Sequence, residues 1–295
     1  MTEKTSPAAS TPARDVVSPP LRLTLLAMPC DASAPVLAAL LAAPGVAVVR
    51  VGLAGAATGG SAPERAAAAA GVPAVGLRDV AAARAVVAAD APDAVAVACF
   101  PWKLPEGLLA LPPLGCLNVH PSLLPLGRGP EPVFWTLRRG ERETGPSVIR
   151  MDAGWDSGPL LAQERLPVPL GVRAPDLEAE LMARGGRLLV DLLPRLAIGA
   201  VVPLPQADAA ATAAPVPAAA DWLMPTTLPA RWAYGFARGV APLAGPLAAQ
   251  AGGRLVRVAD ALAWGEATPG EPVVEHAGGE VTVRFRPGWV RFARR

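Results

Sequence analysis

Histidine, lysine and cysteine are scarce in this chain. Its 295 residues include two histidines and three cysteines, and Lys4 and Lys103 are its only lysines. So few histidines, with no Cys-x-x-Cys pair, argue against a dedicated zinc site, and we expect no metal. The cysteines are odd in number, widely spaced and set in apolar surroundings, which indicates buried thiols in a reducing cytoplasm and excludes a disulfide framework. They are Cys30, Cys99 and Cys116.

Long hydrophobic runs are also absent. No stretch of about 18 apolar residues occurs, so the sequence predicts no transmembrane helix and no membrane partner. The first 20 residues are rich in Ser, Thr, Pro and Ala and lack the apolar segment of a signal peptide, so we expect a disordered tail on a cytoplasmic protein. A net charge of +2 is too small to imply nucleic-acid binding by itself.

Short apolar runs alternate with alanine-rich helical stretches from residue 21 onward. This alternation predicts an α/β fold, with a Rossmann-like, mostly parallel sheet and helices on both faces. Either Asp31 or Ser33 is available to cap the first helix. The expected strands are 21–28, 46–53, 72–77, 94–100, 114–119, 147–151 and 160–168, and the expected helices are 34–42, 62–70, 81–89, 130–138 and 174–196.

The chain divides into parts by composition. Residues 21–205 carry the α/β pattern, and 206–220, dominated by Ala and Pro without periodicity, read as a linker. Residues 221–295 predict a small, mainly β, OB-like C-terminal domain. Its expected elements are a helix at 228–238 and strands at 255–261, 272–276, 281–285 and 289–292.

An amide, an imidazole and a carboxylate are the candidate catalytic groups of this sequence. Asn118 and His120 end a predicted strand, where residues two apart project to the same side, so both side chains are expected to face one reacting atom. Asp156 lies in the turn 154–158, with Asp152 as the competing carboxylate. Alternatively, the histidine is a structural hydrogen-bonder and Asp156 a turn former.

The run CLNVHPSLLPLGRGPEPVFWTLRRGERETGPSVIRMDAGWDSGPLLAQ resembles the core of the 10-formyltetrahydrofolate-dependent formyltransferases. Within that family it is most similar to the methionyl-tRNA formyltransferases. The shared parts, in the family's order, are Asn118-x-His120, the loop 122–125, Arg128-Gly129 and the turn 154–158. The resemblance is sharp from about 95 to 165, and it implies that residues 21–205 are a formyltransferase catalytic domain.

The resemblance implies a reaction and roles for these residues. A formyl group would pass from 10-formyltetrahydrofolate to a primary amine through a tetrahedral carbon bearing an oxyanion. By the resemblance, Asn118 and His120 donate to that oxygen, and losing one such donor typically slows a reaction about 10²–10³-fold. Asp156 would orient or charge the imidazole and relay protons, while Asp152 would shape the turn.

Two binding regions are implied as well. The family's folate pocket corresponds to Trp102, Lys103, Leu104, Gly154 and Trp155, although either tryptophan alone is as readily a core residue. A substrate loop corresponds to Ser122, Leu123, Leu124, Pro125 and Arg128. Arg128 would contact an acceptor phosphate or carboxylate, or else be a solvated loop arginine.

The acceptor is less clearly indicated. The family's tRNA-binding members carry a basic insertion after the second strand, whereas residues 52–63 here contain no Lys or Arg. The predicted C-terminal domain has nine arginines against six acids, with Phe285, Trp289 and Phe292 interleaved near its end. Such a strip would suit RNA backbone and bases, or it is the solvated face of a β-hairpin.

The sequence is therefore consistent with three functions. The first and favoured one is formylation of the amino group of methionyl-tRNA, with tRNA bound partly by the C-terminal domain. The second is formylation of a small amine such as an amino-sugar nucleotide. The third is a non-catalytic folate-binding relative, motivated by the unusual segment 101–104. The sequence predicts no particular oligomeric state.

Overall fold

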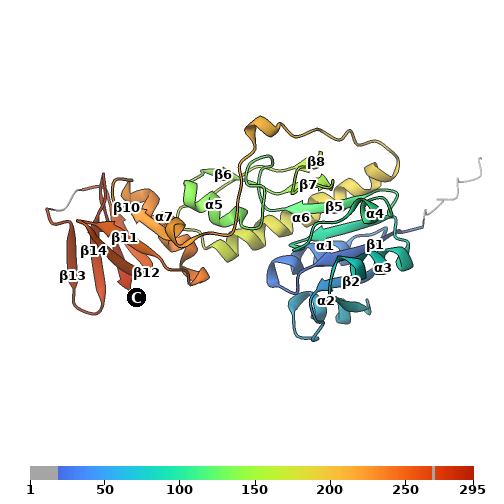
Figure 1. Cartoon of the computed structure of the whole chain (residues 1–295), viewed down its shortest axis with the longest axis horizontal. Helices are drawn as coiled ribbons and strands as arrows, with labels where there is room; N and C mark the ends of the chain where they lie inside the picture. The colour runs from blue at the N-terminus through green and yellow to red at the C-terminus, as the bar shows by residue number, and fades with distance from the viewer. Residues whose placement is uncertain (1–18, 268–269) are drawn as a thin grey trace, which may run out of the picture.

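The computed structural model describes residues 19–267 and 270–295, arranged as an α/β region and a β domain at opposite ends of an elongated molecule (Figure 1). The tail expected for residues 1–20 lies outside the described residues except for Pro19 and Pro20. A long helix, α6 (Ala174–Ala197), runs along the α/β region toward the β domain.

The described part of the α/β region holds a seven-stranded sheet in the order β3-β2-β1-β4-β5-β7-β8. The first five of these strands are parallel, whereas β7 and β8 are antiparallel, so the predicted Rossmann-like, mostly parallel sheet is confirmed. The strand order reverses between β1 and β4, and in open α/β sheets ligands bind beyond the carboxyl ends of the strands at such a point. The strands are β1 (Leu21–Ala27), β2 (Val46–Ala54), β3 (Ala74–Leu77), β4 (Ala94–Ala98), β5 (Cys116–His120), β7 (Ser147–Arg150) and β8 (Leu160–Gln163).

Helices cover both faces of this sheet. Side chains of α1 and α6 pack on one face, and those of α3 and α4 pack on the other. The Ser61 and Asp79 side chains cap α2 and α3 by accepting backbone N–H bonds, as their residue types favour. The helices are α1 (Ala34–Ala42), α2 (Ala62–Ala69), α3 (Val80–Asp90), α4 (Glu106–Leu109) and α5 (Pro132–Arg139), in addition to α6.

Two local expectations are wrong. The first helix is entered through a 3-10 turn, η1 (Asp31–Ser33), and the Ser33 hydroxyl donates to the carbonyls of Met28 and Cys30, so neither proposed side chain caps α1. The strand expected at 160–168 splits into β8 and the short β9 (Leu166–Pro167), which pairs with β6 (Glu143–Thr144) in a separate two-stranded sheet. Between β8 and β9, the Glu164 carboxylate forms an ion pair with Arg184 of α6.

The C-terminal domain is mainly β, as predicted. Its described residues form a six-stranded sheet in the order β10-β11-β12-β15-β14-β13, packed against α7 (Ala230–Val240). The short, alanine- and proline-containing strands β10 and β11 were not predicted. The strands are β10 (Leu223–Pro225), β11 (Ala248–Ala251), β12 (Arg254–Gly265), β13 (Val273–His276), β14 (Glu280–Arg284) and β15 (Trp289–Arg294).

One hydrophobic core joins the two regions. Buried side chains from α5, α6 and α7 and from the C-terminal sheet belong to a single cluster, which includes Phe134, Leu181, Phe236 and Phe292. Across the same junction, the Arg173 guanidinium donates to both carboxylate oxygens of Asp260. The β domain therefore packs directly against the α/β region and is not joined to it by the connecting segment alone.

The segment expected to be a linker is also held in place. Its Thr212 hydroxyl accepts the Gly127 N–H at 2.8 Å, and its Ala213 forms a β-bridge with Arg128. Ala214 is completely buried, and its carbonyl accepts the N–H of Glu131. Residues 206–214 thus connect the two regions along the edge of the candidate site.

Glycine at position 185 allows α6 to pass closely beneath β5. A Cβ placed there would lie 2.3 Å from Cγ1 of Val119 and 3.2 Å from Cβ of Pro146. We predict that Gly185→Ala lowers the free energy of unfolding by about 1–3 kcal/mol, measured by urea denaturation, because the added methyl displaces the strand. The matched control is Gly107→Ala in α4, where the nearest atom is Nε of Arg84 at 3.6 Å. Equal stability of the two variants would contradict the close packing of α6 on β5.

Candidate active site

Three side chains from distant parts of the sequence meet at the carboxyl end of β5. Asn118 and His120 are 8% and 5% exposed, and Asp156 reaches them from the loop between β7 and β8. The Asn118 Nδ2 donates to Oδ1 of Asp156 at 3.2 Å, and Nδ1 of His120 lies 3.7 Å from the same oxygen. We call these residues the Asn–His–Asp cluster. The structure brings together the amide, imidazole and carboxylate that the sequence singled out.

The Asp156 carboxylate is held from several directions. Its Oδ2 accepts the Gly129 N–H at 2.9 Å, so both carboxylate oxygens have donors. The backbone of Asp156 has a left-handed φ of +50°, and the Gln206 amide donates to its carbonyl and to that of Gly158. A non-glycine residue in this region is uncommon and persists where the surroundings enforce it. The position of the carboxylate is therefore determined by contacts with other segments.

The ring orientation of His120 follows from one hydrogen bond. Its Nε2 lies 2.8 Å from the Gly127 carbonyl oxygen, which can only accept, so Nε2 carries a proton. The other ring nitrogen, Nδ1, faces Asp156. In the neutral ring Nδ1 holds the lone pair, so it is the nitrogen available to take a proton at the cluster.

Asp152 has the turn role expected from its place in the sequence. Its Oδ1 accepts from the Gly154 N–H at 2.9 Å and from the Ser157 hydroxyl at 2.8 Å, and the residue is exposed. The turn brings Ser157 so close to Gly154 that a Cβ at Gly154 would lie 1.9 Å from Oγ of Ser157. Asp152 thus shapes the loop that delivers Asp156.

The loop after β5 forms a wall of the site. Ser122, Leu123 and Leu124 are buried, and Pro125 is half-buried. The Ser147 hydroxyl donates to the Ser122 carbonyl at 2.6 Å and accepts the Leu124 N–H at 3.1 Å. This loop therefore supports the site through its backbone.

Arg128 is neither free nor solvated. Its guanidinium donates to Oε1 of Gln206 at 2.8 Å and to Oδ1 of Asp208 at 2.8 Å, and its side chain is 16% exposed. A ligand anion at this position would have to compete with Asp208. The expected contact with an acceptor phosphate or carboxylate has no support in this arrangement.

Four of the five residues matched to a folate pocket fall into two groups, and the fifth, Gly154, lies in the turn that Asp152 shapes. Trp102 packs edge-on against Phe100 with ring centroids 5.2 Å apart, and Leu104 is buried in the same cluster. Lys103 is exposed, and its Nζ lies 5.3 Å from the ring centroid of Trp155, which is 52% exposed. Lys103 and Trp155 thus present side chains beside Asp156, whereas Trp102 and Leu104 belong to the core.

Two neighbouring carboxyl groups lack partners among the described residues. Glu131 and Glu178 are half-buried, and their side chains form no ion pair or hydrogen bond with any described residue. Burial raises the pKa of both, and for Glu178 the pKa reaches about 7, with the nearby Cys30 and Glu131 adding to the effect. Glu178 is therefore partly protonated at neutral pH.

Sequence reasoning missed three supporting residues in the presumed linker. Gln206, Asp208 and Thr212 are the only polar side chains between 205 and 214, and each bonds to a loop of the site. Polar residues isolated within an Ala/Pro stretch were the available signal, because solvated linkers need no such spacing.

Two further properties concern the described part of the chain as a whole. Within residues 19–267 and 270–295, no group of three or more His, Cys, Asp and Glu side chains could hold a metal ion. No helix among them is long and apolar enough to cross a bilayer.

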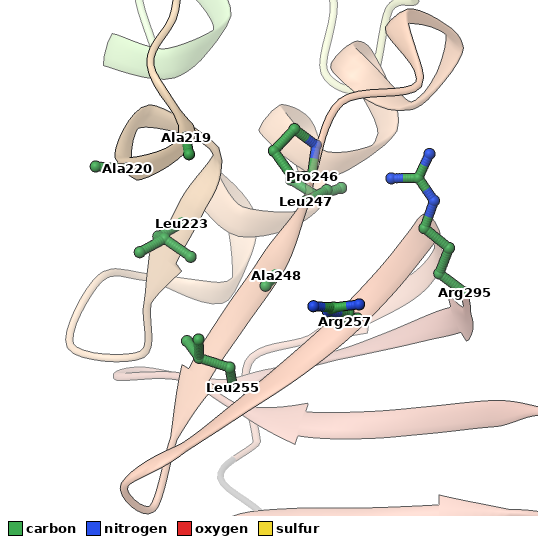
Figure 2. Close-up of a pocket in the computed structure, with 9 residues that line it drawn as sticks. All are labelled: Ala219, Ala220, Leu223, Pro246, Leu247, Ala248, Leu255, Arg257 and Arg295. Atoms are coloured by element: carbon green, nitrogen blue, oxygen red, sulfur yellow. The ribbon is translucent and has the colours of Figure 1, made fainter.

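A hollow of about 600 Å³ lies in the C-terminal domain (Figure 2). Leu223, Leu247, Leu255 and Arg257 are among the residues that line it, and none of its lining residues belongs to the Asn–His–Asp cluster.

Known proteins resemble this chain in sequence and in structure. Residues 51–193 match the formyl transferase family model. Methionyl-tRNA formyltransferase of Roseiflexus sp. (strain RS-1) is 44% identical over 154 residues, 52% of this chain and 47% of that protein. This chain thus spans about half the length of the curated relatives it matches.

Among solved structures, glycinamide ribonucleotide transformylase 1 from Symbiobacterium toebii is 26% identical with a TM-score of 0.55, and the match covers 63% of this chain and 94% of that one. An N-formyltransferase from Helicobacter canadensis, solved with folinic acid and dTDP-3-aminofucose, shares the fold at 13% identity and a TM-score of 0.66, over 93% and 99% of the two chains. The matched residues 51–193 contain the whole Asn–His–Asp cluster. Residues 51–193 therefore match the formyl transferase family, and this part of the chain is similar to methionyl-tRNA formyltransferases.

Proposed function

We propose that this chain transfers a formyl group from 10-formyltetrahydrofolate to a primary amine, and that the amine is the amino group of methionyl-tRNA. The observation that carries the proposal is the convergence of Asn118, His120 and Asp156 at one strand end inside the matched family region. The methionyl-tRNA formyltransferases among its relatives, such as that of Anaeromyxobacter dehalogenans at 39% identity over 204 residues, support the acceptor.

The geometry suits each step of such a transfer. One amide hydrogen of Asn118 bonds to Asp156, which leaves the second free to donate to the formyl oxygen as negative charge develops on it. Nδ1 of His120 can take the proton released by the attacking amine, because Nε2 is committed to Gly127. The resulting imidazolium lies beside the Asp156 carboxylate, which stabilises it.

A folate would find partners at the mouth of the site. The formyl donor carries the reactive carbonyl on a flat p-aminobenzoyl unit that ends in a glutamyl carboxylate. Trp155, directly before Asp156, exposes an aromatic face, and Lys103 supplies a cation beside it. We assign Trp155 to the aromatic unit and Lys103 to the carboxylate. HypX from Aquifex aeolicus, which shares the fold, has been solved with tetrahydrofolic acid.

For a tRNA acceptor, the C-terminal surface differs from what the sequence suggested. Phe285 and Phe292 are completely buried in the domain core, so the expectation that they stack on RNA bases is wrong. Arg291 and Arg294 pair with Glu280 and Glu275, which reduces their free charge.

Unpaired charge remains on β12. Arg257 has no ion pair or hydrogen bond with the described residues and lies in the apolar hollow with Arg295, whose guanidinium donates to the carbonyls of Ala244 and Gly245 (Figure 2). We therefore assign phosphate contact to the β12 face.

A second candidate acceptor is a small amine such as an amino-sugar nucleotide. It is favoured by the loop between β2 and α2, because residues 52–63 contain no Lys or Arg to contact tRNA. The deciding experiment offers 10-formyltetrahydrofolate with methionyl-tRNA or with amino-sugar nucleotides to the full chain and measures formylated product. Product from methionyl-tRNA supports the proposal, and product from the small amine alone would replace it. No turnover with any acceptor, or turnover that survives His120→Ala, would count against the site.

We predict that Asp156→Asn lowers kcat by about 10²–10³-fold, because the imidazolium loses its counter-charge. The dissociation constant for folinic acid should change by less than about threefold, since asparagine keeps the side-chain volume and its oxygen can still accept one of the two N–H bonds. The control is Asp152→Asn, which alters a carboxylate in the same loop and should keep most of the activity. Loss of folate binding in Asp156→Asn would assign Asp156 a structural role instead.

We predict that Lys103→Met and Trp155→Leu each raise the KM for 10-formyltetrahydrofolate about 3–10-fold and leave kcat within about twofold, because both groups bind without touching the reacting carbonyl. Lys103→Arg keeps the cation over the ring and should behave nearly as the native chain. Unchanged KM values in both variants would remove these side chains from the folate site.

We predict that Arg257→Glu raises the KM for methionyl-tRNA about tenfold and weakens its salt dependence by about one phosphate contact. Formylation of a small amine should be unaffected. Arg294→Glu is the matched control, because Arg294 is already paired with Glu275. Equal effects of the two substitutions would indicate a general charge effect and no contact at Arg257. Substitutions are preferred to truncation here because the two regions share a core.

A further inference from the structure

Two thiols lie together at the point where the strand order of the large sheet reverses. The strands β1 and β4 are parallel neighbours in which Ala27 lies opposite Ala98. Cys99 follows β4 directly, and Cys30 follows β1 after two residues. Both thiols are free and half-buried, and each has the largest influence on the pKa of the other, as two neighbouring thiols do. A crevice at such a point is where ligands bind in open α/β sheets.

The surroundings make the two thiols chemically different. The hydrogen bond from Cys99 lowers the pKa of Cys30 to about 6, and backbone N–H groups of Ser33 and Ala32 at the start of η1 and α1 add to this. The bond to Cys30 and burial raise the pKa of Cys99, which keeps its proton. At neutral pH the pair therefore favours a thiolate on Cys30 and a thiol on Cys99.

The third cysteine offers an internal comparison. Cys116 is buried in β5, and burial raises its pKa to about 12. Burial alone shifts the pKa of Cys116, whereas Cys30 and Cys99 each shift the pKa of the other. Low pKa, partial exposure and a second thiol nearby mark cysteines that oxidise reversibly, whereas buried cysteines are inert.

The pair lies between segments that bear on the candidate site. Cys99 has a left-handed φ of +52° and begins the segment that carries Trp102 and Lys103. The adjacent strand places Val119 opposite Ala98, so His120 ends β5 beside the position of Cys99. A covalent bond from Cys99 would act on this segment.

We propose that Cys30 and Cys99 are a modification site: a dithiol that hydrogen peroxide converts to a disulfide. The Cys30 thiolate attacks one peroxide oxygen, the O–O bond breaks, and hydroxide leaves, which gives a sulfenic acid on Cys30. The Cys99 sulfur then attacks the Cys30 sulfur, forms the S–S bond and releases water. Two electrons pass from the thiols to the peroxide, and a dithiol reductant such as thioredoxin or dithiothreitol reverses the reaction.

The consequence for activity rests on the proposed function. The disulfide ties the segment from Cys99 to Lys103 to the loop after β1. We expect the KM for 10-formyltetrahydrofolate to rise at least about fivefold in the oxidised protein and to recover after treatment with dithiothreitol.

The test treats the full chain at neutral pH with a few-fold molar excess of hydrogen peroxide and follows intact mass and peptide mapping. The expected product has lost two hydrogen atoms, links Cys30 to Cys99 and keeps Cys116 free. Cys99→Ala should stop at a sulfenic acid on Cys30, which dimedone traps, and Cys30→Ala should give no adduct at that dose. Cys116→Ser is the matched control and should oxidise as the native chain does.

Separate outcomes overturn separate parts of this inference. A native chain that keeps three free thiols, or that loses Cys116 as fast as Cys30, would overturn the modification site. A disulfide that forms while the KM for folate stays unchanged would overturn its effect on the reaction. The mass measurements do not depend on formyl transfer, so they decide the thiol chemistry even if the proposed function fails.

Discussion

The Asp156 carboxylate is the contact on which the candidate site depends. Its two oxygens accept hydrogen bonds from Asn118 on β5 and from Gly129 in the following loop. Asp156 itself lies in the loop between the antiparallel strands β7 and β8. An ionised carboxylate is a strong acceptor for such N–H donors, so one residue fixes the relative position of three segments. The same oxygen that bonds to Asn118 faces Nδ1 of His120, which links the support of the site to its chemistry.

That carboxylate is in turn held by the segment connecting the two regions. Gln206 donates to the backbone on both sides of the turn and accepts from Arg128, and Thr212 binds Gly127, the residue whose carbonyl orients His120. The connection to the C-terminal domain is therefore part of the wall of the site. Together with the shared core around Phe134 and Phe236, it couples the position of the β domain to that of the cluster.

Sequence patterns predicted what depends on short-range order. Alternating runs indicated the parallel sheet, and the two-residue spacing of Asn118 and His120 placed both on one face of β5, as the structure shows. Sequence patterns gave missing or wrong predictions where contacts between distant residues determine the structure. Alanine carries little periodic signal, so β11 and the docked segment 206–214 were missed, and alternation alone could not show that Phe285 and Phe292 point into a core. The catalytic roles stay predictions.

The geometry of the Asn–His–Asp cluster does not determine which acceptor would be formylated. In the proposed transfer, Asn118, His120 and Asp156 would act on the formyl carbonyl of the donor and on the amine that every candidate acceptor shares. Selectivity would therefore arise where the rest of the acceptor lies. Residues 52–63 of the α/β region contain no Lys or Arg, and Arg257 belongs to the β domain at the opposite end of the molecule (Figure 1). Because a shared core joins the two regions, an acceptor that contacts both the Asn–His–Asp cluster and Arg257 would have to extend along the molecule, whereas a small amine would occupy the cluster alone. Under the proposed function, a tRNA acceptor would contact both the Asn–His–Asp cluster and the β domain.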